Sequence, residues 1–537
     1  MRRALDRLSN ESFDLLIIGG GATGCFTARD AAMRGLKVAL VETKDFASAT
    51  SAHNSKLAHG GLRYLRNLEF SLVRESLRER RNLQFIASHL VRPLPFLLPL
   101  YDTGARERLT LGAGLTLYDF LSYDRNRLND PAQKMPGHRW LTRDAALARE
   151  PVLEGPAFQG AFEYHDAQMY APERIALECL IDAEAHGAAI ANHLAAEKLL
   201  LHEKRAEGTR VRDALTGESF DIRAKLTLVA AGPWADIFLE HATGRAAHHR
   251  LLRSKGIHLL LPEISRAALT VEAGNGHFFV LPWRGHTLLG TTDTEFDGDP
   301  ASVAVSESDI VGFLGLVNRY LPSAHLTRQQ VEFFYAGLRP LVDDGSGQTY
   351  NASRRSELVD HAKDDGIDGL VSALGGKWTT SRNLAQTIVD AAVKKLGVKA
   401  KACATAATPL PGGTFDHWED LVRGFEKNWP GISSIRHLAH MFGARLPQLL
   451  KGVKVSDLAP LNQSGDTLAQ IGIAVNSEMA LTLEDVVMRR TCLGQFGPPG
   501  NLEKIADVMG GFLGWDEARK AREIASLAPL YQTREAQ

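Results

Sequence analysis

The first hydrophobic run of the chain, Leu15 to Ile18, is preceded by polar residues and followed by a cluster of glycines. A short apolar run with such boundaries is typical of a strand buried in a parallel sheet. The next segment, "FTARDAAMRGL" (26–36), has apolar residues at helical spacing, and "KVALVE" (37–42) is a second apolar run that ends at Glu42. The pattern therefore predicts a strand–helix–strand unit close to the N-terminus.

Three glycines lie between the first strand and the helix and form a G-x-G-x-x-G motif: Gly19, Gly21 and Gly24. In this arrangement the first allows a tight turn, the second lets the backbone approach a pyrophosphate, and the third lets the helix pack on the sheet. The helix N-terminus then attracts phosphate. Glu42 lies near the spacing expected of a carboxylate that binds ribose hydroxyls, which argues against NADP.

The same unit binds either NAD or FAD, and two features favour FAD. The motif lies at the extreme N-terminus, and a later apolar run, "AKLTLVAAGPWAD" (224–236), ends in small residues and Gly232. We expect this run to return to the sheet beside the first strand.

The spacing of apolar residues changes twice along the rest of the chain. Runs such as "GHFFVLPW" (276–283) and "HTLLGTT" (286–292) have the alternating pattern of strands. Residues after "ATPLPGGTFD" (407–416) have apolar positions three and four apart, as in helices. We expect an α/β Rossmann-like FAD-binding domain that is discontinuous, an α+β substrate-binding cap domain and an all-helical C-terminal domain. The predicted ranges are 12–75, 155–238 and 340–400 for the first, 76–154 and 239–339 for the second, 401–416 for a linker and 417–537 for the third.

Composition narrows the class of protein. The apolar fraction is 44%, the charged fraction 23% and the net charge −1, so there is no general basic field for nucleic acid. The four cysteines have no metal-ligand spacing, which favours reduced thiols inside a cell, and we expect Cys25 to be a packing residue. We find neither a membrane span of about 18 apolar residues nor a signal-peptide pattern. The expected location is the cytoplasm.

Several motifs resemble, in order along nearly the whole chain, the FAD-dependent glycerol-3-phosphate dehydrogenases and oxidases of the D-amino-acid-oxidase-like flavoprotein group. They include "SKLAHGGLRYL" (55–65), "FFYAGLRPLVDD" (333–344), "ALGGKWTTSRNLA" (373–385) and "EMALTLEDVVMRRTCLG" (478–494). The resemblance implies oxidation of sn-glycerol 3-phosphate to dihydroxyacetone phosphate, with hydride transfer from C2 to flavin N5 and a quinone, rather than O₂, as the electron acceptor.

The resemblance also implies a substrate site. Arg63, Arg339 and Lys377 are expected to converge on the substrate phosphate and hydroxyls, since a guanidinium matches phosphate oxygens bidentately. Tyr64 and Thr380 are expected beside them. His258 has a pKa suited to a general base, although a histidine beside an apolar run can also be a packing residue. Arg339 is the rival group for ionising the C2 hydroxyl.

For the cofactor, we expect backbone and hydroxyl contacts from several glycine-marked segments. Ser55 and Lys56 are expected at the FAD phosphates or ribose, Gly60 and Gly61 under the flavin, and Gly375, Gly376, Thr379 and Thr380 at its pyrimidine end. The full set of expected FAD residues is Gly19, Gly21, Gly24, Glu42, Thr50, Ser51, Ser55, Lys56, Gly60, Gly61, Gly232, Gly376, Lys377 and Thr379. We expect no metal site.

Some questions stay open from the sequence. The substrate could be another polyol phosphate, such as erythritol phosphate, or the protein could be an amine or amino-acid oxidase or a flavin-bearing regulatory protein. "RERLTLGAGLTLYDFLSYDRNR" (106–127) has an apolar centre flanked by arginines. It is either a peripheral segment at the inner face of the cytoplasmic membrane or an ordinary helix of the cap domain. A homodimer is also left open.

Overall fold

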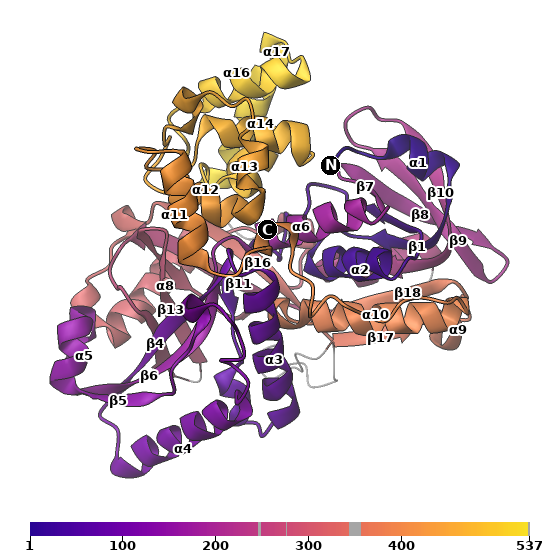
Figure 1. Ribbon diagram of the computed structural model, residues 1–537. Helices are drawn as coiled ribbons and strands as arrows, with labels where there is room; N and C mark the ends of the chain where they lie inside the picture. The colour runs from indigo at the N-terminus through magenta and orange to yellow at the C-terminus, as the bar shows by residue number, and fades with distance from the viewer. Residues whose placement is uncertain (245–248, 275, 343–355, 535–537) are drawn as a thin grey trace.

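The computed structural model describes residues 1–244, 249–274, 276–342 and 356–534. Figure 1 shows three parts: a sheet with helices α2 and α10 on the right, a second sheet with helices α4 and α5 at the lower left, and a group of C-terminal helices above them. The predicted fold class, an α/β domain with an α+β domain and a helical C-terminus, is confirmed.

The first sheet is built around β1 (Ser12–Ile18), as the N-terminal pattern predicts. β1 pairs in parallel with β2 (Val38–Val41) and with β10 (Ser219–Val229), so the later apolar run does return beside the first strand. The strand order is β17-β18-β10-β1-β2-β7, with β8 and β9 continuing from β10. The remaining strands are β7 (Ala189–Ala191), β8 (Leu194–His202), β9 (Arg205–Asp213), β17 (Ser356–Asp360) and β18 (Leu370–Gly375).

Alternate residues of β1 enter two different hydrophobic cores, as a strand buried on both faces requires. Leu15 and Ile17 pack into a core that includes residues of helices α2, α6 and α10, while Leu16 and Ile18 pack into a core on the opposite face. The helices of this domain are α1 (Leu5–Asn10), α2 (Ala22–Met33), α6 (Pro172–Ala185), α7 (Ala235–Thr243), α9 (His361–Asp364) and α10 (Ser381–Leu396).

The second sheet forms the cap domain and has the order β15-β11-β14-β13-β12-β4-β6-β3, with β16 paired to β11 and β5 to β6. Its strands are β3 (Leu57–Ala58), β4 (Val91–Tyr101), β5 (Arg139–Thr142), β6 (Phe158–Met169), β11 (Leu251–Pro262), β12 (Ala268–Ala273), β13 (Gly276–Trp283), β14 (His286–Gly290), β15 (Thr294–Glu295) and β16 (Phe333–Val342). Its helices are α3 (Phe70–Ile86), α4 (Ala105–Leu121), α5 (Arg143–Arg149) and α8 (Glu307–Tyr320).

Strand pairing bears on three of the predicted domain boundaries. β6 pairs along its length with β4, so the chain returns to the first domain only at α6 and not at residue 155. β3 pairs with β6, which places residues 57–58 in the cap sheet although they fall within the predicted range 12–75. The end of β16 extends the cap to residue 342. In each case the strand pairs with a partner that is distant in the chain, and the local composition does not indicate this pairing.

The helical C-terminus is confirmed. Its helices are α11 (Trp418–Asn428), α12 (Ile435–Phe442), α13 (Leu446–Leu449), α14 (Leu468–Ser477), α15 (Leu483–Asp485), α16 (Leu502–Leu513) and α17 (Glu517–Ser526), and a π-helix spans Val486–Arg490. Thr482 caps α15, and its hydroxyl accepts a hydrogen bond from the Asp485 N–H. Across the ranges that the structure describes, no helix is both long and apolar enough to cross a membrane.

Candidate active site

The glycine turn after β1 has the tight geometry that the motif predicts. Gly19 has a φ of +113°, and a Cβ on it would lie 2.5 Å from the Ala230 carbonyl oxygen. A Cβ on Gly24 would overlap the carbonyl oxygen of Gly19. The turn therefore depends on glycine at both positions. It places the N-terminus of α2 at the end of the sheet, where the N–H groups of the first helical turn can bind an anion.

Glu42 lies at the end of β2, next to this turn. Its carboxylate accepts hydrogen bonds from the Gly20 N–H (2.6 Å) and the Lys44 N–H (2.9 Å). Burial outweighs these bonds and raises the pKa of Glu42. The side chain is half-buried, so its position at the strand end fits an acceptor for the hydroxyls of a ribose beside the phosphate site.

The loop after Glu42 carries four of the expected FAD residues, and they differ in what they contact. The Ser51 hydroxyl accepts a hydrogen bond from the Ala22 N–H at the start of α2 (2.9 Å), so Ser51 lies at the phosphate turn. Thr50 donates to the Leu338 carbonyl in β16 (2.7 Å). Ser55 lies in the cap-side cluster described below. The loop therefore runs from the phosphate turn to the cap domain, as expected of a segment that follows the cofactor.

The side chain of Lys56 is buried among protein groups. Its ammonium group is buried, donates to the Ala52 carbonyl (2.9 Å), and lies 3.7 Å from the Glu173 carboxylate and 5.3 Å from the centre of the Trp283 ring. Burial lowers its pKa. These partners hold the side chain in the domain junction, so we expect only the backbone of Lys56 to reach the cofactor.

The glycine pair at 60–61 is needed for packing of the protein as well as for the expected close approach of the backbone to the flavin. A Cβ on Gly60 would overlap the side chains of Leu77 in α3 and Tyr118 in α4, and the Gly60 N–H donates to Asp166 (3.1 Å). Gly61 has a φ of +75°. The absence of side chains lets this segment lie against two helices before it turns toward Arg63.

Of the three cations expected at the substrate, Arg63 and Lys377 both lie near the ring of Tyr64, whereas Arg339 lies in the second group described below. The Lys377 ammonium lies 4.2 Å and the Arg63 guanidinium 5.2 Å from the centre of the Tyr64 ring. Lys377 also donates to the Ser76 hydroxyl (3.3 Å). Tyr64 is buried, while both cations are half-buried. Two cations that share one aromatic ring form a concentrated positive site, which suits a doubly charged phosphate.

His258 lies in a second group of side chains. Its Nε2 is hydrogen-bonded to the Ser55 hydroxyl (2.9 Å), and its ring stacks on Tyr335 with centres 4.9 Å apart. Burial and, after it, the nearby Arg339 lower the pKa of His258 well below its usual value. These surroundings favour the neutral form of the ring, which is the form that can accept a proton.

Arg339 lies on β16 beside His258 and is held from two sides. Its guanidinium donates to the Ser254 hydroxyl (3.0 Å) and to the Thr291 hydroxyl (2.8 Å). Gly256 in β11 lies directly beneath, where a Cβ would overlap the guanidinium. The group is half-buried and lies 3.8 Å from the Asp293 carboxylate, so its positive charge is held near His258 and is partly balanced by Asp293.

The segment after β18 supplies the remaining predicted residues. Gly375 and Gly376 have φ values of +67° and +99°, and the Thr379 hydroxyl accepts a hydrogen bond from the His59 N–H (3.3 Å). The Thr380 hydroxyl donates to the Lys377 carbonyl (3.4 Å). The segment therefore lies against residues 59–64. Gly232 follows β10 with a φ of +53° and open space around its Cα.

Sequence reasoning missed several neighbours of these groups. Tyr335 stacks on His258 and also on His53, and the ring centres of His53 and Tyr335 are 5.3 Å apart. Trp378 donates a hydrogen bond to the Ser51 carbonyl (3.1 Å). Tyr335 could have been found, because it shares one face of β16 with Arg339, four residues along. Ser254 and Thr291 could not have been, since only the pairing of β11 with β14 and β16 brings them to Arg339.

Comparisons with known proteins identify the family of the chain. A family model described as FAD dependent oxidoreductase matches residues 14–382, and one described as the C-terminal domain of alpha-glycerophosphate oxidase matches residues 403–520. The glycerol-3-phosphate dehydrogenase of Synechocystis is 35% identical over 97% of both chains. The mitochondrial glycerol-3-phosphate dehydrogenase of Mus musculus is 34% identical over 95% of this chain and 72% of its own length.

A solved structure points the same way. The glycerol-3-phosphate dehydrogenase from Bacillus halodurans complexed with FAD is 28% identical, covers 98% of this chain and 96% of its own, and superposes with a TM-score of 0.79. L-alpha-glycerophosphate oxidase from Mycoplasma pneumoniae, at 18% identity, 73% coverage of this chain and 96% of its own, and a TM-score of 0.54, shares the fold. From the family model over most of its length and from these full-length relatives, the chain belongs to the FAD-dependent oxidoreductases and, within them, to the glycerol-3-phosphate dehydrogenase family.

Proposed function

We propose that the protein oxidises sn-glycerol 3-phosphate to dihydroxyacetone phosphate with bound FAD and passes the electrons to a quinone. The observation that carries the proposal is the placement of Arg63 and Lys377 over the Tyr64 ring in a chain whose relatives are named for this substrate. An amino-acid oxidase needs one cation for a carboxylate, whereas a phosphate gains from several. When bound, FAD would accept the hydride from C2, and this hydride carries both of the electrons that the substrate loses.

The residues of the chain divide the remaining work. Arg63 and Lys377 bind the phosphate and so fix the distance from it to C2. Neutral His258 takes the proton of the C2 hydroxyl, and we assign this to Nε2, because that nitrogen faces segment 55–64 through Ser55. Arg339 stabilises the negative charge that develops on the C2 oxygen, and, after burial, it is the second cause that lowers the pKa of His258.

We assign the cofactor residues to parts of FAD from the pyrophosphate to the flavin. The first turn of α2, with Gly21 before it, would hold the pyrophosphate, and Glu42 would accept the ribose hydroxyls. Thr379 and the glycines at 375–376 lie where the chain passes segment 59–64, and we assign them to the flavin end. A side chain on Gly21 would take the space of the pyrophosphate.

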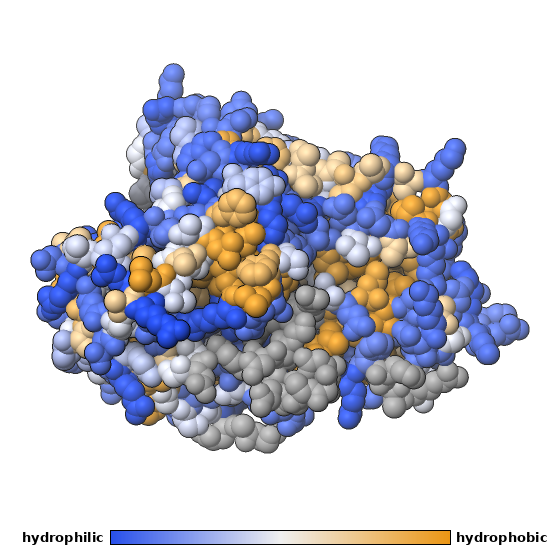
Figure 2. Space-filling model, turned by 90° about the horizontal axis from the view of Figure 1, so that it is seen from below, coloured by the Kyte–Doolittle hydropathy of each residue, from blue (hydrophilic) through white to orange (hydrophobic). Residues whose placement is uncertain are grey.

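Contact with a membrane surface would bring the enzyme to a quinone. The underside of the cap domain exposes four large apolar side chains on and near α4: Leu68 (70% exposed), Leu109 (74%), Phe120 (73%) and Tyr123 (63%). Figure 2 looks onto this face and shows hydrophobic residues gathered beside hydrophilic ones. Arginines flank the group, so its chemistry suits the headgroup region of an anionic bilayer. The segment 106–127, for which the sequence left both an interfacial and an ordinary cap helix open, contains α4 up to Leu121, and the exposed apolar side chains favour the interfacial alternative.

The test of the substrate is steady-state turnover with a soluble quinone as acceptor. We expect turnover with glycerol 3-phosphate, at least 10-fold less with erythritol phosphate, and very little with glycerol or amino acids. Faster turnover of erythritol phosphate would reassign the substrate, and turnover of amino acids alone would overturn the proposal.

Flotation with anionic vesicles tests whether the exposed apolar side chains on and near α4 bind a membrane. Phe120→Glu should abolish binding of the protein to the vesicles. Ile237→Glu, which changes an exposed apolar residue of α7, should leave that binding unchanged.

A further inference from the structure

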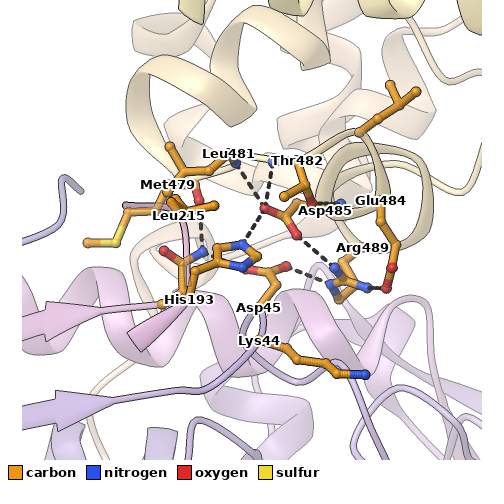
Figure 3. Close-up of polar contacts among 12 residues, drawn as sticks. Lys44, Asp45, His193, Leu215, Met479, Leu481, Thr482, Glu484, Asp485 and Arg489 are labelled. Atoms are coloured by element: carbon orange, nitrogen blue, oxygen red, sulfur yellow. Dashed lines mark hydrogen bonds and ion pairs between the residues drawn. The ribbon is translucent and has the colours of Figure 1, made fainter. Parts of the chain in front are cut away.

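The loop that follows Glu42 is anchored to the C-terminal domain through a buried ionic cluster, which we call the loop clamp (Figure 3). It consists of Asp45, His193, Asp485, Arg489 and Arg490, and Figure 3 labels all of these except Arg490. Asp45 accepts from Arg489 Nε (2.6 Å) and from both Nη atoms of Arg490 (2.7 and 2.9 Å). Asp45 lies three residues after Glu42, whereas both arginines lie in the C-terminal π-helix.

A second contact joins the same two domains. The Asp485 carboxylate accepts from His193 Nε2 (2.9 Å) and from Arg489 Nη2 (2.8 Å). The backbone N–H of His193 donates to the Lys44 carbonyl (2.8 Å), and the Lys44 N–H donates to the Glu42 carboxylate (2.9 Å). A continuous series of hydrogen bonds therefore runs from the C-terminal domain to the carboxylate assigned to the ribose.

Burial makes this arrangement rigid. Asp45 and Asp485 are fully buried, Arg490 is 2% exposed and Arg489 5%. Oxygen and nitrogen atoms of Asp45, His193 and Asp485 lie within 4.8 Å of one another, a spacing that a metal ion could use. However, both carboxylates are already neutralised by two arginines, so a cation has little to gain there. The cluster is better explained as a structural anchor.

We propose that Arg489, Arg490 and Asp485 are positioning residues for FAD: through Asp45 and His193 they hold the loop that aims Glu42 and Ser51 at the adenosine and phosphate end of the cofactor. Docking of the C-terminal domain is then part of cofactor retention, which gives this domain a role that its own residues do not reveal. The inference rests on FAD occupying the site, as in the proposed function.

The chain offers a matched control. Arg174 in α6 forms a bidentate pair with Glu478, and both are buried in the same interface between the first and C-terminal domains. Arg174 lies on a helix and binds the Glu478 carboxylate, whereas Arg490 donates only to the Glu478 backbone carbonyl (2.9 Å), so Arg174→Gln removes no contact of the cofactor loop. Arg174→Gln should therefore destabilise the fold as a clamp variant does, while leaving Glu42 and Ser51 in place.

The experiment measures FAD release from the holoenzymes of Arg490→Gln, Asp485→Asn and Arg174→Gln, by recovery of flavin fluorescence well below each unfolding midpoint. Loss of a charge-assisted bond should speed release about tenfold or more in the two clamp variants. Arg174→Gln should stay within about twofold of wild type, and Arg490→Lys should recover part of the loss. Affinity of the apoprotein for ADP should fall by the same factor as affinity for FAD.

Two results would overturn the inference. One is release from the clamp variants at the wild-type rate. The other is equal acceleration in Arg174→Gln, which would reduce the clamp to one of several packing contacts. A purified protein without FAD would contradict the proposed function as well. In contrast, bound FAD that glycerol 3-phosphate fails to reduce would contradict the proposed activity alone and leave the clamp standing.

Discussion

At the scale of single residues, the Tyr64 ring and the two cations over it carry most of the expected substrate selectivity. We predict that Arg63→Ala lowers kcat/KM for glycerol 3-phosphate at least ~10-fold, because a charge-assisted hydrogen bond contributes roughly 1.5–3 kcal/mol and each 1.4 kcal/mol is about tenfold. Arg63→Lys should recover only part, since the ammonium loses the planar fork. Glycerol is the control: its poor turnover should barely change, and an equal loss on both substrates would assign Arg63 to the flavin or the fold.

His258 gives a second prediction at this scale. His258→Ala should slow anaerobic flavin reduction roughly 10²–10⁴-fold while changing the affinity for substrate little, since a positioned base acts on the chemical step. Stopped-flow absorbance separates the two effects. Reduction within a few-fold of wild type would make His258 a packing residue beside Tyr335 and would move the base elsewhere.

The sequence predicted these residues unevenly. Arg63, Lys377 and His258 lie in motifs that resemble a known family, and the structure brings the first two together at Tyr64. Lys56 lies in the same motif as Arg63, "SKLAHGGLRYL", but in a different environment. Its backbone is left-handed (φ +56°), and its side chain is buried in the domain junction near Glu173. A residue's motif therefore indicates which segment it belongs to, but not which way its side chain points.

At the scale of elements, the pairing of β11 with β16 sets the position of Arg339. We predict that Gly256→Ala lowers kcat/KM at least ~10-fold with little change in the unfolding midpoint. The added methyl overlaps both the Arg339 guanidinium and the Thr291 hydroxyl that accepts a hydrogen bond from it, so it breaks this bond and displaces Arg339. Gly312→Ala in α8, where a Cβ meets open space, is the control and should keep full activity. A large fall in the unfolding midpoint of Gly256→Ala would instead indicate strain on the sheet.

Elements were predictable where their pattern is local. β1, β2 and β10 follow from apolar runs with glycine or polar boundaries, and the helical C-terminus follows from its spacing. The fate of β6 and β16 was not predictable, because a strand's sheet is decided by partners far away in the chain: β6 joins β4, and β16 joins β11.

At the scale of the whole molecule, buried histidines should make the free energy of unfolding decrease at acidic pH. Burial lowers the pKa of His53 and His440 to about 3 and that of His258 well below its usual value. Below pH 6.5 the unfolded chain binds protons that the folded protein does not, so the free energy of unfolding falls as pH decreases. His193, whose pKa is raised by its bond to Asp485 despite burial, acts in the opposite direction.

We therefore predict a lower unfolding midpoint at pH 5 than at pH 7, with each buried neutral histidine contributing about 1.4 kcal/mol per pH unit below 6.5. His440→Gln should make this decline shallower, and thermal unfolding at several pH values measures it. A midpoint that rises between pH 7 and 5 would show that His193 and other groups with raised pKa values dominate.

The organisation of the whole molecule is also the part that the sequence revealed least. Asp45 and Arg490 are 445 positions apart, and nothing near either residue predicts that they meet. Residues in the first domain, the cap and the C-terminal domain all border the cofactor loop, so the site is completed only when the three domains are docked. This explains why a nearly continuous match to relatives extends through a C-terminal domain without recognisable chemistry.

The central claim is that bound FAD takes electrons from glycerol 3-phosphate, and its most direct test is anaerobic titration of the purified holoenzyme. We predict that the visible flavin absorbance is bleached at a ratio near one substrate per flavin, that erythritol phosphate bleaches it far more slowly, and that glycerol leaves it unchanged over the same time. Flavin that stays oxidised in excess glycerol 3-phosphate, in a protein with a full complement of FAD, would contradict the account.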